Sequence, residues 1–124
     1  TLRRQGRPDV TDVVVTVPKG LWQEWIEEGD LPGDPWSNQD SYYSFGGTVP
    51  VIRPGERVYI VAHNKLRGYA PLSEVVVSLY GRAFVRQGGA VAVTIDEPIR
   101  GFRGWRYRWW HRDNEQPFPD WRVP

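Results

Sequence analysis

A short polar run, His63-Asn64-Lys65, lies between two apolar stretches, and Arg67 follows it closely. Asn and Lys are common in tight turns, so one interpretation is a solvated hairpin tip. In the other interpretation, His63, Lys65 and Arg67 contact the polar edges of a ligand, and a desolvated Lys65 serves as a general base. If the chain hydrolyses that ligand, the residues expected to assist are Thr94, Glu56 and Glu74.

Aromatic residues are unusually frequent, with seven Trp, six Tyr and four Phe in 124 residues. Three of them, Trp36, Tyr42 and Tyr43, lie in a stretch from Asp30 to Gly47 that is rich in Gly, Pro, Ser and Asn and predicts a long loop. Stacking of one base on an aromatic ring is worth about 1–3 kcal/mol. The three side chains are therefore candidate stacking walls for a nucleobase, and the alternative is that they seal the loop against the body of the domain.

The second half of the chain is basic, with seven Arg and only two acids between Arg82 and Arg112. From Trp105 to Trp109 aromatic and basic residues alternate, which predicts a strand with an apolar inner face and an arginine outer face. Arg suits phosphate because its planar fork donates two hydrogen bonds. The alternative is a solvated edge strand whose charge discourages aggregation. The predicted phosphate-binding residues are Arg100, Arg103, Arg106 and Arg108.

An acidic segment precedes this basic half, because the stretch from Gly20 to Ile52 holds six acids and neither Lys nor Arg. A short helix is expected from about Lys19 to Glu28, with Gly29 as its stop. The acidic face of this helix is a candidate surface for a protein partner. A net charge of only +1 favours that hypothesis mildly, since dedicated nucleic-acid binders are usually more basic. The acids on this face are Glu24, Glu27 and Glu28.

Several chemistries lack their sequence signatures. Cysteine is absent and the two histidines, His63 and His111, lie far apart, so no zinc spacing exists and no metal is expected. There is no P-loop, dinucleotide fingerprint or Gly-x-Ser-x-Gly elbow, so no cofactor is expected. No apolar run approaches the roughly 20 residues of a membrane helix, and nothing resembles a signal peptide. We therefore expect no membrane partner and a cytoplasmic location.

These candidate residues need a β-rich scaffold to position them. Short β-branched and aromatic runs separated by Gly and Pro turns indicate a small barrel or sandwich, and the helix makes the class α+β. No linker divides the chain, so residues 1–124 are expected to form one domain, with 1–9 frayed and 113–124 an irregular tail. Strands are expected at 10–17, 57–62, 66–80 with a bend at 68–71, 83–86, 90–95 and 105–109.

The segment Ile52-Arg-Pro-Gly-Glu-Arg-Val-Tyr-Ile-Val-Ala62, followed by Leu66-Arg-Gly-Tyr-Ala-Pro-Leu-Ser-Glu-Val75, resembles the core hairpin of ASCH and EVE domains in the PUA-like superfamily. The resemblance implies a small PUA-like β-barrel with one or two short helices. It also implies a cleft between barrel and helix that holds RNA, a modified nucleobase or a nucleoside. Some ASCH proteins hydrolyse RNA or acylated cytidine, but the stretch from Gly29 to Trp36 lacks the Lys, Glu and Arg of their signature.

Three functional hypotheses follow. The first is non-catalytic recognition of a nucleobase, modified or not, or of a short RNA or DNA segment. The second is an ASCH-like hydrolase acting on RNA or a modified nucleoside. The third is a phage or accessory protein-interaction module that uses the acidic helix face. The missing signature favours binding over catalysis.

Overall fold

The computed structural model describes residues 11–27, 41–86 and 90–124. Within them the chain is β-rich with a single short α-helix, which confirms the expected β-rich α+β class. The expected PUA-like type stays a prediction. In chain order the elements are β1 (Val13–Thr16), the 3-10 helix η1 (Lys19–Leu21), α1 (Trp22–Glu27), β2 (Ser41–Phe45), β3 (Arg57–Ala62), β4 (Lys65–Ser78), β5 (Gly81–Arg86), β6 (Val93–Thr94), β7 (Trp105–Tyr107), the 3-10 helix η2 (Arg112–Asn114) and β8 (Gln116–Pro117).

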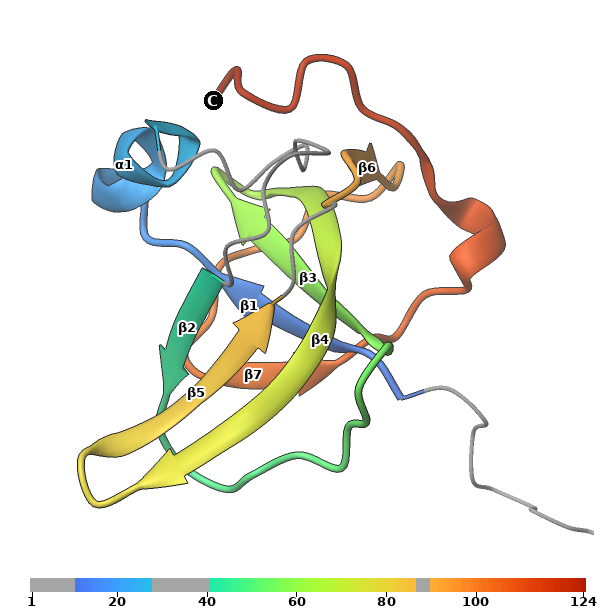
Figure 1. Cartoon of the computed structure of the whole chain (residues 1–124). Helices are drawn as coiled ribbons and strands as arrows, with labels where there is room; N and C mark the ends of the chain where they lie inside the picture. Colours follow the sequence, from blue (N-terminus) through green and yellow to red (C-terminus); the bar gives the residue numbers. More distant parts are fainter. Residues whose placement is uncertain (1–10, 28–40, 87–89) are drawn as a thin grey trace, which may run out of the picture.

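The main sheet has the strand order β2-β5-β4-β3-β1-β7 and curls into a half-barrel (Figure 1). β1 is parallel to β3, with Val14 opposite Tyr59, and the other neighbours are antiparallel. β6 and β8 form a separate two-stranded sheet. β1 lies between β3 and β7, so segments that are distant in sequence meet on both sides of it.

Strand β4 gives the sheet its curl. A strand broken by a bend was predicted at 66–80, but the structure has one continuous strand of 14 residues. Its first half pairs with β3 and its second half with β5, with register shifts at Ile60/Val61 and at Leu72/Glu74. Such irregularities bend a strand without ending it, so the predicted interruption becomes a change of partner.

The predicted loop from Asp30 to Gly47 is wrong at its C-terminal end, where β2 pairs with β5. Aromatic residues suit a pleated surface, and this preference outweighs the loop signal of the flanking Gly and Ser. Phe45 stacks on Phe84 with ring centroids 4.2 Å apart. Residues 30–40 of the predicted loop lie outside the described part of the chain.

Two apolar clusters cover the two faces of β1 and β3. Val13, Val15 and their neighbours on β3 face one cluster, while Val14, Tyr59 and Val61 face the other. Ile95, Ile99 and Trp110 from the C-terminal third cover the second face. Strands buried on both faces are continuously apolar, which explains the Val13-Val14-Val15 run.

The C-terminal segment, expected as an irregular tail, lies against the half-barrel. It passes beside the sheet and ends near α1 (Figure 1). Trp121 is 4% exposed and meets Trp22 edge to face, with ring centroids 6.0 Å apart. The Trp22 indole N–H donates to the carbonyl of Arg122 at 3.2 Å. Arg67, fully buried, donates to the carbonyls of Trp121 and Val123 and to that of Ala62.

Candidate functional site

An open cavity of about 460 Å³, called the hollow below, lies where β3 turns into β4. Its size falls within the range of about 300–1,000 Å³ that is usual for small-molecule sites. Three predicted functional residues, His63, Lys65 and Thr94, line it, although Thr94 is some 30 residues away in sequence. The full lining is His63, Asn64, Lys65, Thr94, Ile95, Asp96, Glu97, Pro98 and Phe118.

The turn at the rim of the hollow has an unusual backbone. His63 and Asn64 both have positive φ, 49° and 62°, as a two-residue I′ hairpin turn requires. Gly at the second position would adopt this conformation more easily, and strained residues of this kind persist where the surroundings hold them. The amide of Ile99 donates to the carbonyl of Asn64 at 3.0 Å and fixes the turn against the segment after the hollow.

Polar groups of both kinds face the hollow. Burial, aided by the charges of Arg67 and Lys19, lowers the pKa of His63 below its usual 6.5, so the imidazole is neutral at neutral pH. A neutral imidazole has one donor and one acceptor nitrogen. Lys65 adds a cation, and Asp96, which accepts from the Gln116 amide at 3.0 Å, adds an anion. The hollow can therefore match a ligand edge that carries donors and acceptors together.

The hollow also has apolar walls. Ile95 is buried, Pro98 contributes its ring, and the half-buried Phe118 supplies an aromatic face. The amide of Phe118 donates to the Ala92 carbonyl at 3.1 Å, which fixes the backbone beside β6. Phe118 was not among the predicted ligand contacts, because only the docking of the C-terminal segment brings it to the hollow.

Three of the four predicted phosphate-binding arginines, Arg100, Arg103 and Arg106, are exposed, and they are called the exposed arginines below. Arg106 lies over the Phe102 ring, 4.3 Å from its centroid, and the half-exposed Trp109 meets Phe102 edge to face. The bond between Ile99 and Asn64 places the start of this segment at the rim of the hollow. Cations and aromatic rings therefore continue from the hollow along one segment.

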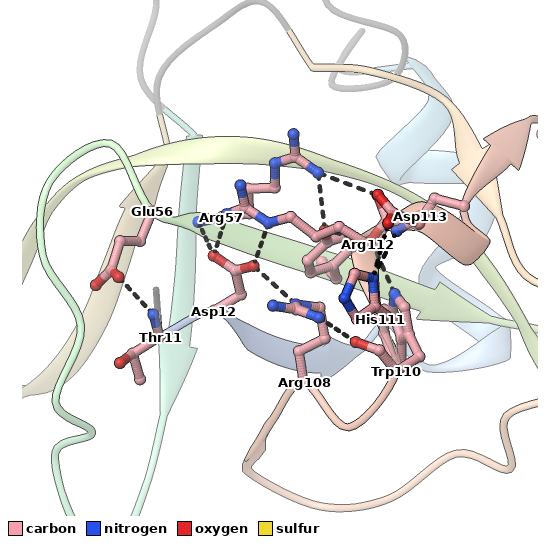
Figure 2. A network of polar contacts seen from close by, with 11 residues as sticks. Thr11, Asp12, Glu56, Arg57, Arg108, Trp110, His111, Arg112 and Asp113 are labelled. Carbon is pink, nitrogen blue, oxygen red and sulfur yellow. Dashed lines mark hydrogen bonds and ion pairs between the residues drawn. The ribbon is translucent and has the colours of Figure 1, made fainter. Parts of the chain in front are cut away.

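Arg108 differs from the other predicted phosphate contacts, because its Nε donates to Asp12 at 2.8 Å and its guanidinium also bonds the Trp110 carbonyl. Figure 2 shows this carboxylate between Arg108 and Arg112, which donates two further bonds to Asp12. The predicted alternation fails here because β7 ends at Tyr107. As a result Trp110, and not Trp109, is the buried ring.

Asp12 is the centre of a structural network and was not predicted. Burial of Asp12 acts to raise its pKa, but hydrogen bonds from Arg112, from the Arg57 amide and from Arg108 outweigh it, and the pKa is lowered. The same bond to Asp12 raises the pKa of Arg112. Nearby, Glu115 accepts hydrogen bonds from the Arg57 guanidinium, the Tyr59 hydroxyl and the Trp110 indole. The network joins β1, β3 and the C-terminal segment.

Two predicted ligand contacts are instead packed into the fold. Arg67 is fully buried on backbone carbonyls, and burial lowers its pKa. Tyr43 donates its hydroxyl to the Thr16 carbonyl and meets Trp25 edge to face at 6.3 Å. Burial raises its pKa, with the bond to Thr16 acting the other way. Both residues are thus occupied by internal contacts.

Several other predicted residues have different outcomes. Trp36 and Glu28 lie outside the described residues, and so does the side chain of Tyr42. Glu24 and Glu27 are exposed on α1, as the acidic helix face requires.

Of the hydrolase set, Lys65 and Thr94 share the hollow, but Glu56 bonds the amides of Thr11 and Arg53. Glu74 is exposed on β4 opposite Val85. The structure therefore does not bring the four residues together.

The described residues contain no cluster of three or more His, Cys, Asp or Glu side chains that could hold a metal ion. Within the same ranges, no helix has the length and apolarity needed to cross a membrane. Comparisons with family models, with curated proteins and with solved structures find no match to this chain.

Proposed function

We propose that the hollow binds a nucleobase, presented by a nucleoside or by a short RNA or DNA strand, without chemical turnover. The observation that carries the proposal is the convergence of His63, Lys65 and Thr94 with the ring of Phe118 around one cavity of suitable size. Base edges carry donors and acceptors side by side, and the polar wall of the hollow offers both in return. Phe118 supplies the apolar face on which a base stacks.

The exposed arginines extend the proposal to phosphate. Arg100 is exposed and directly follows Ile99, whose amide bonds the turn at the rim, so the backbone of Arg100 starts at the edge of the hollow. Arg106, stacked on Phe102, combines a charge for the backbone with an aromatic neighbour for a second base. A nucleotide or single strand should therefore bind more tightly than the corresponding free nucleoside. Trp36 and Tyr42 remain the predicted additional stacking walls.

Calorimetric titration with a panel of nucleosides, nucleotides and short oligonucleotides tests this function. Lys65→Ala and Phe118→Leu should each weaken binding by about five- to 150-fold, equivalent to the loss of one contact worth about 1–3 kcal/mol. Arg53→Ala is the control that removes the same charge, because Arg53 is exposed and does not line the hollow.

The control should retain the affinity of the unmodified chain, and unfolding curves should show that each variant is folded. Equal losses in Lys65→Ala and Arg53→Ala would reduce the effect to net charge and remove the hollow as the site. Absence of binding to every member of the panel would also end the proposal. Hydrolysis of a bound ligand that Lys65→Ala abolishes would replace recognition with catalysis.

A further inference from the structure

Opposite charges lie on different walls of the hollow. The turn between β3 and β4 contributes Lys65, whereas the segment after β6 contributes Asp96 and Glu97. Among the described residues, no ion pair joins Lys65 to either acid. The amine and the carboxylates therefore remain apart, and a ligand that enters the hollow can contact both kinds of charge.

The acidic wall keeps acceptor oxygens available and extends beyond the hollow. The Gln116 amide donates to one carboxylate oxygen of Asp96 at 3.0 Å, which positions the side chain and leaves its second oxygen to a ligand. Glu97 is exposed and makes no hydrogen bond to another described residue. Asp96 and Glu97 also line a neighbouring cavity of about 470 Å³, to which Asp113 adds a third carboxylate. This wall therefore attracts hydrogen-bond donors and repels phosphate.

The opposite wall attracts acceptors. Burial, together with the charges of Arg67 and Lys19, lowers the pKa of His63, so two cations besides Lys65 act on this side of the hollow. The ring of Phe118 also lines the hollow, and the guanidinium carbon of the buried Arg67 lies 5.5 Å from its centroid. An aromatic wall that is packed in this way can stack a base without first being ordered.

Guanine is the standard base whose donors and acceptors are separated in the same manner. Its N1–H and N2–H₂ groups donate side by side on one edge, where the two oxygens of a carboxylate can accept them. Its O6 and N7 atoms accept on the adjoining edge, and Lys is a common partner for them. Adenine and cytosine place a single amino group beside ring acceptors, and uracil places its single N–H between two carbonyls. A carboxylate that faces one of these edges also meets an acceptor.

We propose that the hollow selects guanine among the bases. This inference rests on the proposed function and adds the identity of the base to it. The carboxylates of Asp96 and Glu97 accept from N1–H and N2–H₂, and the Lys65 amine donates to O6 or N7. The base stacks on Phe118. Hydrogen bonds to charged groups are stronger than those between neutral groups, so the preference for guanine should be large enough to measure.

Calorimetric titration of the full chain with the 5′-monophosphates of guanosine, inosine, adenosine, cytidine and uridine tests this selectivity. Guanosine monophosphate should bind most tightly. Inosine monophosphate lacks only the 2-amino group and should bind about ten-fold more weakly, as the loss of one hydrogen bond to a charged acceptor predicts. The double variant Asp96→Asn with Glu97→Gln should bring these two ligands to within about two-fold of each other, because its amides no longer offer paired acceptors.

The matched control is the double variant Glu24→Gln with Glu74→Gln, which removes the same charge from exposed acids that do not line the hollow. It should retain the guanine preference, and both double variants should retain the thermal midpoint, since all four side chains belong to exposed residues. Equal affinity for the five nucleotides, or a preference for another base, would overturn the inference and leave the proposed function standing. So would a guanine preference that survives Asp96→Asn with Glu97→Gln. Absence of binding to all five would end the proposed function, and this inference with it.

Discussion

Charged side chains at the two ends of β3 lie in opposite environments. At its first residue, Arg57, the strand enters the network around Asp12, where every charge has a close internal partner. Just past its last residue, His63 and Lys65 line an open cavity together with Asp96 and Glu97. Polar groups saturated by protein partners stabilise a fold, whereas polar groups that line an open cavity are available to a ligand.

This difference separates arginines that look alike in the sequence. Arg106 and Arg108 are two residues apart in one aromatic and basic segment. The first is exposed over Phe102, and the second is committed to Asp12. The lesson is that residue type gives the chemistry that is possible, while the internal partner decides whether that chemistry is available to a ligand.

The largest expected effect is on stability and concerns the Asp12 network, at the Arg57 end of β3. Asp12→Ala would leave Arg108 and Arg112 without their buried carboxylate and should lower the free energy of unfolding by about 3–5 kcal/mol. Denaturant unfolding at neutral pH measures this loss. Asp113→Ala, at a side chain that is 88% exposed, is the control and should change stability by less than about 0.5 kcal/mol. Similar values for the two variants would contradict the structural role of Asp12.

The stability that the Asp12 network provides should also be sensitive to acid. The pKa of Asp12 is below its ordinary 3.8, so the unfolded state takes up the proton first as the pH falls. The stabilisation is therefore complete above about pH 4 and disappears as the pH falls through the lowered value. Thermal midpoints of Asp12→Asn should fall less steeply in this acid range than those of the unmodified chain. Parallel curves would show that Asp12 does not carry the acid response.

Arg106 and Arg108 give the sharpest comparison, although the expected effect on ligand binding is smaller than the effects on stability above. If Arg106 contacts a phosphate, Arg106→Ala should lower the slope of log affinity against log salt by about one for a single-stranded ligand. Arg108→Ala should leave that slope unchanged and should instead reduce stability, because it opens the Asp12 network. The reverse pattern, with the slope following Arg108, would mean that the network opens on binding.

Much of the scaffold could be predicted from local sequence. The β-branched run at β1 and the apolar stretch of β3 indicated strands, and the polar residues between β3 and β4 indicated their turn. β2 was missed because its Tyr and Phe residues are flanked by the Gly, Ser and Asn typical of loops. Local composition therefore predicted a strand correctly where no loop-like residues interrupt or flank the apolar run. It failed at β2, where the aromatic residues indicate a strand and the flanking residues indicate a loop.

The site was only half predictable, because distant contacts decide it. His63, Lys65 and Thr94 were identified from their chemistry, but Phe118 reaches the hollow only through the docked C-terminal segment. Arg67 and Arg108 were assigned to ligands, whereas their partners are carbonyls at Trp121 and Val123 and a carboxylate at Asp12. Such pairings leave no periodicity in the sequence, so the burial of these cations could not be foreseen.

Mapping of amide chemical shifts by NMR, during titration with the tightest-binding nucleotide, tests the central claim most directly. The largest changes should fall on residues that line the hollow, at 63–65, 94–98 and 118, and on the exposed arginines. The amides of Asp12, Arg57 and Arg112 should change little, because their network is already saturated. Changes centred on that network or on the β4–β5 turn, with none at 63–65 and 94–98, would contradict the assignment of the hollow as the binding site.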